Sequence, residues 1–214
     1  SAGPDFEKRV ADSRERPFLP TAAMRAQLDI ECRDFEGRSI WKIAPKDRKP
    51  AAHMLYFHGG GYVYPAVDVH WKFFTHMADK HVLEITAPFY PLAPEAGAEE
   101  TVAWAMAAYR DFIANHDGTF ILGGDSAGGG LAATVAQQAR DAGLRQADGL
   151  ILICPWLDVT VSHPDQKRIE PRDCILTIAG GQMAGRMYAR DIALEDPRVS
   201  PINGSWTGLP PVLA

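Results

Sequence analysis

Between Ala52 and Cys154, short apolar runs alternate with longer stretches of helical periodicity. The apolar runs are residues 52–57, 82–87, 119–122 and 150–154, and helical patterns at 68–80, 98–115 and 127–141 separate them. Nearly continuous apolar strands are typical of a sheet that is covered on both faces, and strands that alternate with helices favour parallel pairing. We therefore expect an α/β domain built as a three-layer sandwich, with a mostly parallel central sheet and helices on both faces.

The helical stretches carry local signals for burial and for a helix start. Val102, Ala105, Tyr109 and Phe112 recur at spacings of three and four residues, which places them on one face of a helix. We expect this stripe to be buried against the sheet. Asp68 is the expected N-cap of the first helix, because its side chain can accept a hydrogen bond from a free backbone N–H.

The segments that flank this alternation have other roles. Residues 27–35 and 39–44 surround Glu36-Gly37, which predicts an antiparallel hairpin at the edge of the sheet. We assign residues 1–26 as an N-terminal segment that is a candidate part of a lid. The main domain then covers residues 27–214.

A polar stretch broken by Pro164 and Pro171 follows the last apolar run, and a helix is expected from about residue 175 to 190. We interpret the segment from about residue 158 to 195 as a lid-like insertion. Residues 212–214 look like the start of another strand. We therefore expect further C-terminal strands of the sheet to lie beyond this sequence.

The composition excludes several classes of protein. Hydrophobic residues make up 46% and charged residues 23%, which suits a water-soluble domain, and no window reaches ~18 apolar residues. The same composition suggests no membrane partner, and the net charge of −5 gives no basic patch for nucleic acid. Three cysteines argue against a disulfide framework. Without a signal peptide at the N-terminus, cytoplasmic localisation is the expectation.

The strongest local motif is Gly124-Asp-Ser-Ala-Gly128, which lies between a predicted strand and a predicted helix. A serine hydroxyl is a poor nucleophile and must be exposed on a sharp turn, which flanking glycines permit. The following helix directs free N–H groups, beginning with that of Ala127, toward the place where an anionic intermediate would form. Taken alone, the motif also fits a glycine-rich turn that binds phosphate or merely packs tightly.

A second motif, His58-Gly-Gly-Gly61, directly follows the predicted strand 52–57. In a parallel sheet this loop would lie beside the serine turn, so that the N–H groups of Gly60 and Gly61 face the same anion. Side chains at these positions would block a substrate carbonyl. The ring of His58 is interpreted as an anchor of the loop rather than a proton carrier.

With both motifs in this order, the sequence resembles the bacterial hormone-sensitive-lipase-like esterases of the α/β-hydrolase superfamily. The matching segments, which span about residues 28 to 214, are His58–Gly61, Tyr90–Glu95, Gly124–Gly128, Pro155–Asp158 and Asp196–Pro201.

The resemblance implies Ser126 as the nucleophile and Gly60, Gly61 and Ala127 as the oxyanion hole, with His58 and Asp125 in support. It implies a carboxylic ester hydrolase that acts on short- to medium-chain acyl esters through an acyl-enzyme, with no metal or organic cofactor. The expected partner is a small-molecule ester, and a homodimer is left open.

The acid and base of a catalytic triad are not evident. In α/β-hydrolases they follow the serine in the order acid, then histidine, and His163 is the only histidine after Ser126. By the resemblance, both are expected beyond Ala214. An internal pair of Asp158 with His163 is the weaker alternative, because a triad takes its base and acid from different loops.

A metal site among the histidines of the helix at 68–80 is not expected. His70 and His81 share a helix face but sit ~16 Å apart, and His76 points elsewhere. Two other functions stay open on the sequence. One is hydrolysis of amides, carbamates or N-formyl groups by the same residues, and the other is a small-molecule receptor that has lost members of the triad.

Overall fold

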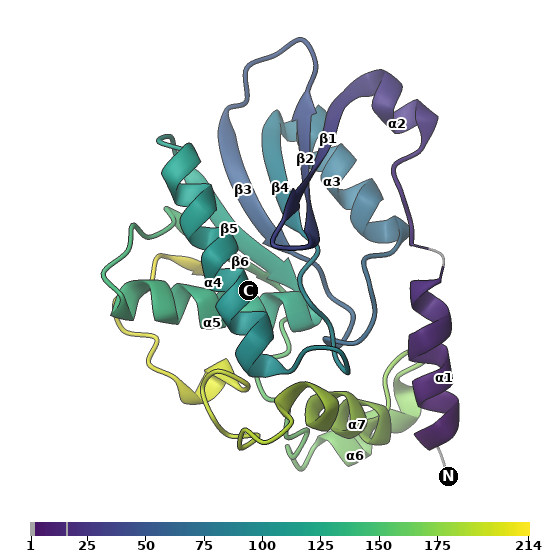
Figure 1. Ribbon diagram of the computed structural model, residues 1–214. Coiled ribbons are helices and arrows are strands. Elements are labelled where there is room, and N and C mark those ends of the chain that lie inside the picture. The colour runs from purple at the N-terminus through teal and green to yellow at the C-terminus, as the bar shows by residue number, and fades with distance from the viewer. Residues whose placement is uncertain (1–2, 16) are drawn as a thin grey trace.

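A computed structural model describes residues 3–15 and 17–214 and shows one seven-stranded sheet with helices packed on it (Figure 1). The strands lie in the order β1-β2-β4-β3-β5-β6-β7. Their bounds are β1 Leu28–Phe35, β2 Arg38–Pro45, β3 Ala52–Phe57, β4 Leu83–Pro88, β5 Phe120–Asp125, β6 Gly149–Ile153 and β7 Val212–Leu213. Every strand expected within this sequence is present, and its ends lie within three residues of the predicted ones.

The pairing is mixed in the way that the sequence predicted. β1 and β2 form the antiparallel edge hairpin, and Glu36 and Gly37 turn the chain with φ of +49° and +76°. β2 also pairs antiparallel with β4, whereas the remaining four pairs are parallel. Parallel strands place all their carboxyl ends at one edge of the sheet, so the loops that follow β3 and β5 meet there.

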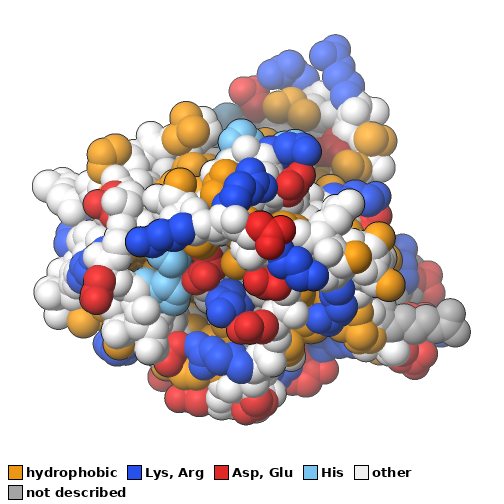
Figure 2. Space-filling view, turned by 90° about the horizontal axis from the view of Figure 1, so that it is seen from above, with side chains coloured by type: hydrophobic (Ala, Val, Ile, Leu, Met, Phe, Trp, Pro, Cys, Tyr) orange, Lys and Arg blue, Asp and Glu red, His pale blue; other side chains and the backbone are white. Residues whose placement is uncertain are grey.

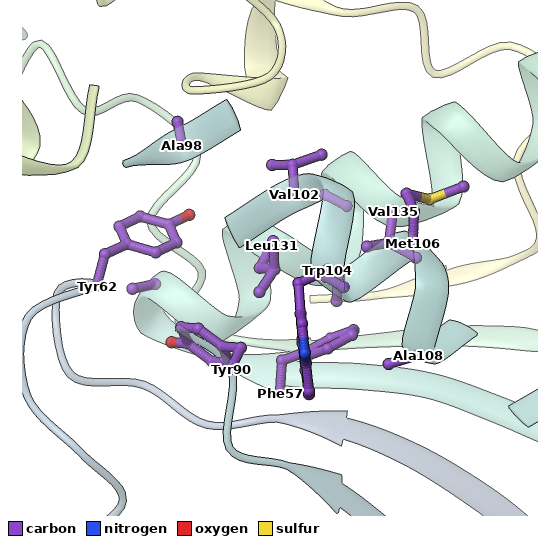
Figure 3. Packing of buried hydrophobic residues seen from close by; sticks show 14 of the residues in the cluster. Phe57, Tyr62, Tyr90, Ala98, Val102, Trp104, Met106, Ala108, Leu131 and Val135 are labelled. Atoms are coloured by element: carbon purple, nitrogen blue, oxygen red, sulfur yellow. The ribbon is translucent and has the colours of Figure 1, made fainter. Parts of the chain in front are cut away.

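Helices cover both faces of the sheet, which confirms the three-layer sandwich. Helix α3 (Asp68–His81) covers one face, where Trp71, Phe74 and Ile85 belong to one buried cluster. Helices α4 (Ala98–Asn115) and α5 (Ser126–Asp141) pack together over the other face. Figure 3 shows this second layer, with Val102 and Met106 of α4 beside Leu131 and Val135 of α5.

Local predictions for the helices are confirmed with one correction. The stripe of Val102, Ala105, Tyr109 and Phe112 is buried, with at most 3% of any of these residues exposed. Asp68, however, is not the N-cap of α3. The cap is Val67, whose N–H donates to His70 Nδ1 at 2.9 Å, and the Asp68 carboxylate instead pairs with Lys72 one turn later.

The remaining helices are α1 Gly3–Arg14, α2 Ala22–Gln27, α6 Gln166–Ile169 and α7 Ile178–Ala189, with single 3₁₀ turns at Glu170–Arg172 and Pro201–Asn203. Helices α1, α6 and α7 gather near the carboxyl ends of the strands (Figure 1). Rings of Phe6 in α1 and Tyr64 pack edge-on, and Tyr188 of α7 stacks on Tyr62 at 3.7 Å. Both α1 and α7 therefore contact the segment that follows β3, and only α2 lies away from this end, against β1.

The sequence did not predict α1 and α2, because the N-terminal residues are mostly polar. A helix formed by such residues depends on contacts elsewhere in the fold. No helix among residues 3–15 and 17–214 is long and apolar enough to cross a membrane. All three cysteines are free and exposed.

We expect Phe74→Ala to lower the free energy of unfolding by about 3 to 5 kcal/mol, because it leaves a cavity between α3 and the sheet. Phe74 is fully buried and packs against the rings of Tyr56 and Trp71. Urea unfolding measures the change. Phe18→Ala is the control, since Phe18 is 48% exposed and its loss should change the value by only about 0.5 kcal/mol. Similar losses in both variants would contradict the core assignment.

Candidate active site

The two glycine motifs meet at the carboxyl edge of the sheet. β3 and β5 are parallel neighbours, with Phe57 opposite Gly124, so the loop His58–Gly61 and the turn Gly124–Gly128 leave the sheet side by side. The N–H of Gly59 donates to Asp125 Oδ1 at 2.9 Å and joins them directly. The structure thus brings together motifs that lie roughly 65 residues apart in the sequence.

Ser126 occupies the junction between strand β5 and helix α5. Its φ of +49° lies in the left-handed region that L-residues rarely adopt, which is the sharp turn expected for this motif. The turn leaves no room for a side chain at Gly128, because a Cβ there would overlap the carbonyl oxygens of Phe57 and His58. The carbonyl of Ser126 accepts the N–H of Trp156 at 2.8 Å, which fixes the turn from the other side.

The glycine loop presents backbone donors beside this turn. Gly60 and Gly61 have φ of +125° and +61°, and the Gly60 carbonyl accepts the N–H groups of Val63 and Tyr64 at 3.1 and 2.8 Å. Within the part of the chain that is described, the N–H groups of Gly60 and Gly61 have no backbone acceptor. The N–H of Ala127 lies in the first turn of α5, where the helix dipole favours negative charge. Two of the predicted donors therefore lie on the loop after β3, and the third lies in the helix turn that follows Ser126.

Asp125 is the centre of a hydrogen-bond network that the sequence did not reveal. Its carboxylate accepts from Tyr56 Oη–H at 3.0 Å and from Gly59 N–H, and His70 Nε2 lies 3.3 Å away. Burial by itself would raise the pKa of Asp125, but the hydrogen bond and charge of His70, with those of Gly59 and Tyr56, hold it below its ordinary value. The carboxylate is consequently ionised at neutral pH.

Tyr56 and His70 lie far from Asp125 in the sequence. His70 stands three residues into a helix, and Tyr56 is one aromatic residue of an apolar strand. No spacing pattern links either residue to Asp125, so the sequence offered no signal for this network.

His58 lies inside the wall of the site rather than on its surface. It is 1% exposed, its Nδ1–H donates to the carbonyl of Gly59 at 2.6 Å, and its ring stacks on Tyr90 at 4.6 Å. Burial lowers the pKa of His58 to about 4, so the ring is neutral at neutral pH. The Tyr90 hydroxyl donates a hydrogen bond to the carbonyl of His58 at 2.7 Å and so stabilises the glycine loop His58–Gly61.

The pair Asp158 and His163 does not assemble at Ser126. Asp158 Oδ1 accepts from the N–H and hydroxyl of Thr160 at 2.9 and 2.6 Å, and His163 is exposed, with Nδ1 accepting from the N–H of Asp165. Among residues 3–15 and 17–214, no hydrogen bond joins a histidine ring to the Ser126 hydroxyl. A general base for Ser126 is therefore not found in the described part of the chain.

A mostly parallel sheet with a serine turn after β5 and a glycine loop after β3 defines an α/β-hydrolase fold. Residues 54–214 match a protein family that is described by its alpha/beta hydrolase fold. The chain belongs to the hormone-sensitive-lipase-like family of α/β hydrolases.

Relatives with described activities support the same placement. The chain is 30% identical to a triacylglycerol lipase of Mycobacterium tuberculosis over 85% of this chain and 37% of that protein. It is 28% identical to an esterase of Acinetobacter venetianus, over 91% of this chain and 69% of the esterase. The crystal structure of a hormone-sensitive lipase from a metagenome library superposes with a TM-score of 0.80 at 28% identity, covering 98% of this chain and 76% of that one. The chain therefore spans about a third to two thirds of the length of these curated relatives.

The Asp125 network predicts a stability difference that depends on pH. The pKa of Asp125 is lower in the folded protein than in the unfolded chain, where it is about 3.9. The ionised carboxylate therefore stabilises the fold at pH values above the unfolded pKa, and this stabilisation is lost as the pH falls through the pKa of the folded protein. We expect Asp125→Asn to lower the free energy of unfolding by about 2 to 3 kcal/mol at pH 7, and the deficit should shrink below about pH 4. Urea unfolding from pH 7 to pH 3 measures it.

Asp117→Asn is the control for the loss of one carboxylate, because Asp117 is exposed on the loop after α4. A deficit in Asp125→Asn that stays constant over the whole pH range would contradict the role of the charge.

Proposed function

We propose that the protein is a carboxylic ester hydrolase that acts on short- to medium-chain acyl esters through an acyl-enzyme on Ser126. One observation carries the proposal: Ser126 sits on a strained strand-to-helix turn with the backbone donors of the glycine loop beside it. The membership of the hydrolase family and the names of the relatives, an esterase and a triacylglycerol lipase, support it.

In the proposed reaction, Ser126 Oγ attacks the ester carbonyl carbon and its proton passes to a general base. The N–H groups of Gly60, Gly61 and Ala127 stabilise the oxyanion of the tetrahedral intermediate. Collapse of the intermediate breaks the bond to the alcohol, which takes the proton from the base. Water then attacks the acyl-enzyme by the same steps and releases the acid.

Two groups in the proposal hold the donors in place and do not touch the substrate. The ionised Asp125 bonds Gly59 N–H at 2.9 Å, and His58 locks the loop through Gly59 and Tyr90. Preorganised donors stabilise a developing charge without reorganising during the reaction. The general base and its carboxylate partner are not found beside Ser126 in the described residues, and we place them in sequence beyond Ala214.

The preference for short acyl chains rests on the aromatic wall next to α5. The rings of Tyr62 and Tyr188 stack at 3.7 Å and are each 1% exposed, and Trp156 packs on Tyr62 at 5.8 Å. A Cβ at Gly130, in the first turns of α5, would meet the Tyr62 hydroxyl at 2.5 Å. Because α7 stacks Tyr188 on Tyr62 directly after the glycine loop, we propose that these rings limit the length of an acyl chain bound beside Ser126.

We expect Ser126→Ala to reduce kcat for p-nitrophenyl butyrate by at least about a thousandfold, since the nucleophile is lost. Steady-state assays of the full-length protein measure this. Ser205→Ala is the matched control, because Ser205 is an exposed serine near Pro201–Asn203. Equal rates in wild type and Ser126→Ala would contradict the nucleophile. Tight binding of the ester by the wild type without turnover would instead support a receptor.

We expect kcat/KM to be higher for p-nitrophenyl acetate and butyrate than for the decanoate, because in this proposal the stacked rings of Tyr62 and Tyr188 limit the length of the acyl chain. Parallel assays below the solubility limit of each ester measure this order. An optimum on long-chain, emulsified esters would contradict it. Faster hydrolysis of a p-nitroanilide than of the matching ester would move the assignment to an amidase.

A further inference from the structure

A cluster of two histidines and a glutamate lies at the opposite edge of the sheet from Ser126. His53 and Glu84 are the second residues of the parallel neighbours β3 and β4 and stand directly opposite one another. His116 follows the last residue of α4. His53 is level with Phe120, six residues before Ser126, so the cluster lies about 20 Å from the nucleophile along β5.

The three side chains converge on one point. His53 Nδ1 lies 3.2 Å and His116 Nε2 lies 3.1 Å from Glu84 Oε1, and all three atoms are within 4.8 Å of one another. A tetrahedral zinc ion with bonds of about 2.0 to 2.2 Å requires ligand atoms about 3.4 Å apart. Two of the three spacings already approach this value, so small rotations of the side chains would admit the ion.

His116 is held in the orientation that metal binding requires. Its Nδ1–H donates to the carbonyl of Phe112 at 2.8 Å, and its ring stacks on the Phe112 ring at 4.2 Å. A backbone acceptor on one imidazole nitrogen is the usual partner of a metal-bound histidine and directs the other nitrogen at the metal. Arg145 donates to the carbonyl of His116 and fixes the backbone at this position.

The cluster is mostly buried, and a groove connects it to solvent. The side chains of His53, Glu84 and His116 are only 25%, 15% and 17% exposed. His116 also lines an open groove of about 420 Å³ between α4 and strands β1, β2 and β4, which leaves room for a water ligand. Two cations line this groove, and both are paired with acidic side chains: Lys42 with Glu31 at 2.9 Å, and Arg33 with Asp111. Figure 2 views this end of the molecule and shows histidines set among acidic and basic side chains.

We propose that His53, Glu84 and His116 form a binding site for a single divalent transition-metal ion, best suited to Zn²⁺. Two imidazole nitrogens, one carboxylate oxygen and one water form a common four-coordinate zinc set, whereas Mg²⁺ and Ca²⁺ require more oxygen ligands. The ion would join β3, β4 and the α4–β5 connection. Because it is remote from Ser126, its role is to stabilise the fold, and the proposal stands independently of the ester hydrolysis.

The test is a titration of the chelator-treated protein with zinc chloride, followed by calorimetry and by thermal unfolding. We expect one ion per chain and a rise in Tm with zinc that EDTA reverses, because the ion binds the folded state. Glu84→Gln keeps the size of the side chain but removes the charge, and we expect it to weaken binding by about tenfold or more, as should His116→Gln. His76→Ala and His81→Ala, on exposed histidines of α3, are the matched controls.

A second measurement separates ligation from a merely structural effect. Cobalt(II) in a tetrahedral site with nitrogen and oxygen ligands gives visible absorption bands, which should appear in the wild type and the controls and disappear in Glu84→Gln. Circular dichroism verifies that the variants are folded. Absence of zinc binding in the wild type, or unchanged binding in folded Glu84→Gln and His116→Gln, would overturn the proposal.

Discussion

The hydrogen bond from Gly59 N–H to the Asp125 carboxylate joins the two loops on which the candidate active site depends. The loop after β3 carries two of the three candidate oxyanion donors, and the turn after β5 carries the third donor and the serine. An acceptor that is ionised and mostly buried makes a stronger hydrogen bond than a neutral one, so the spacing between the loops is well defined. Tyr56 and His70 bond the same carboxylate and balance the cost of its burial.

Close packing of backbone on backbone makes this arrangement possible. Gly128 lies against the carbonyls of Phe57 and His58, so that α5 starts directly beside the end of β3. Helix α7 then closes the same end through the stack of Tyr188 on Tyr62, and α1 approaches through Phe6 and Tyr64. The serine is thus placed by the sheet, whereas the shape of the space around it depends on segments outside the sheet.

The two edges of the sheet carry different chemistry for a topological reason. Parallel strands collect their carboxyl ends, with their glycine loops, at one edge and their amino ends at the other. His53 and Glu84 stand at the second edge as register partners, and the end of α4 adds His116. The site residues at each edge lie close together because of the strand order β4-β3-β5. No local sequence pattern predicts this strand order.

The sequence by itself determined the layers, the strands, the edge hairpin and the candidate nucleophile, because each of these depends on a local signal. Apolar runs define strands, the spacing of Val102 and Phe112 defines a buried helix face, and glycines around Ser126 define a turn. The tertiary structure alone decided what meets across long separations. Asp125 contacts His70 over 55 residues, and Glu84 contacts His53 and His116 over 31 and 32 residues. Such contacts follow from strand order and packing, and no periodicity in the chain encodes them. For the same reason, the polar residues of α1 gave no sign of the helix that they form against the segment after β3.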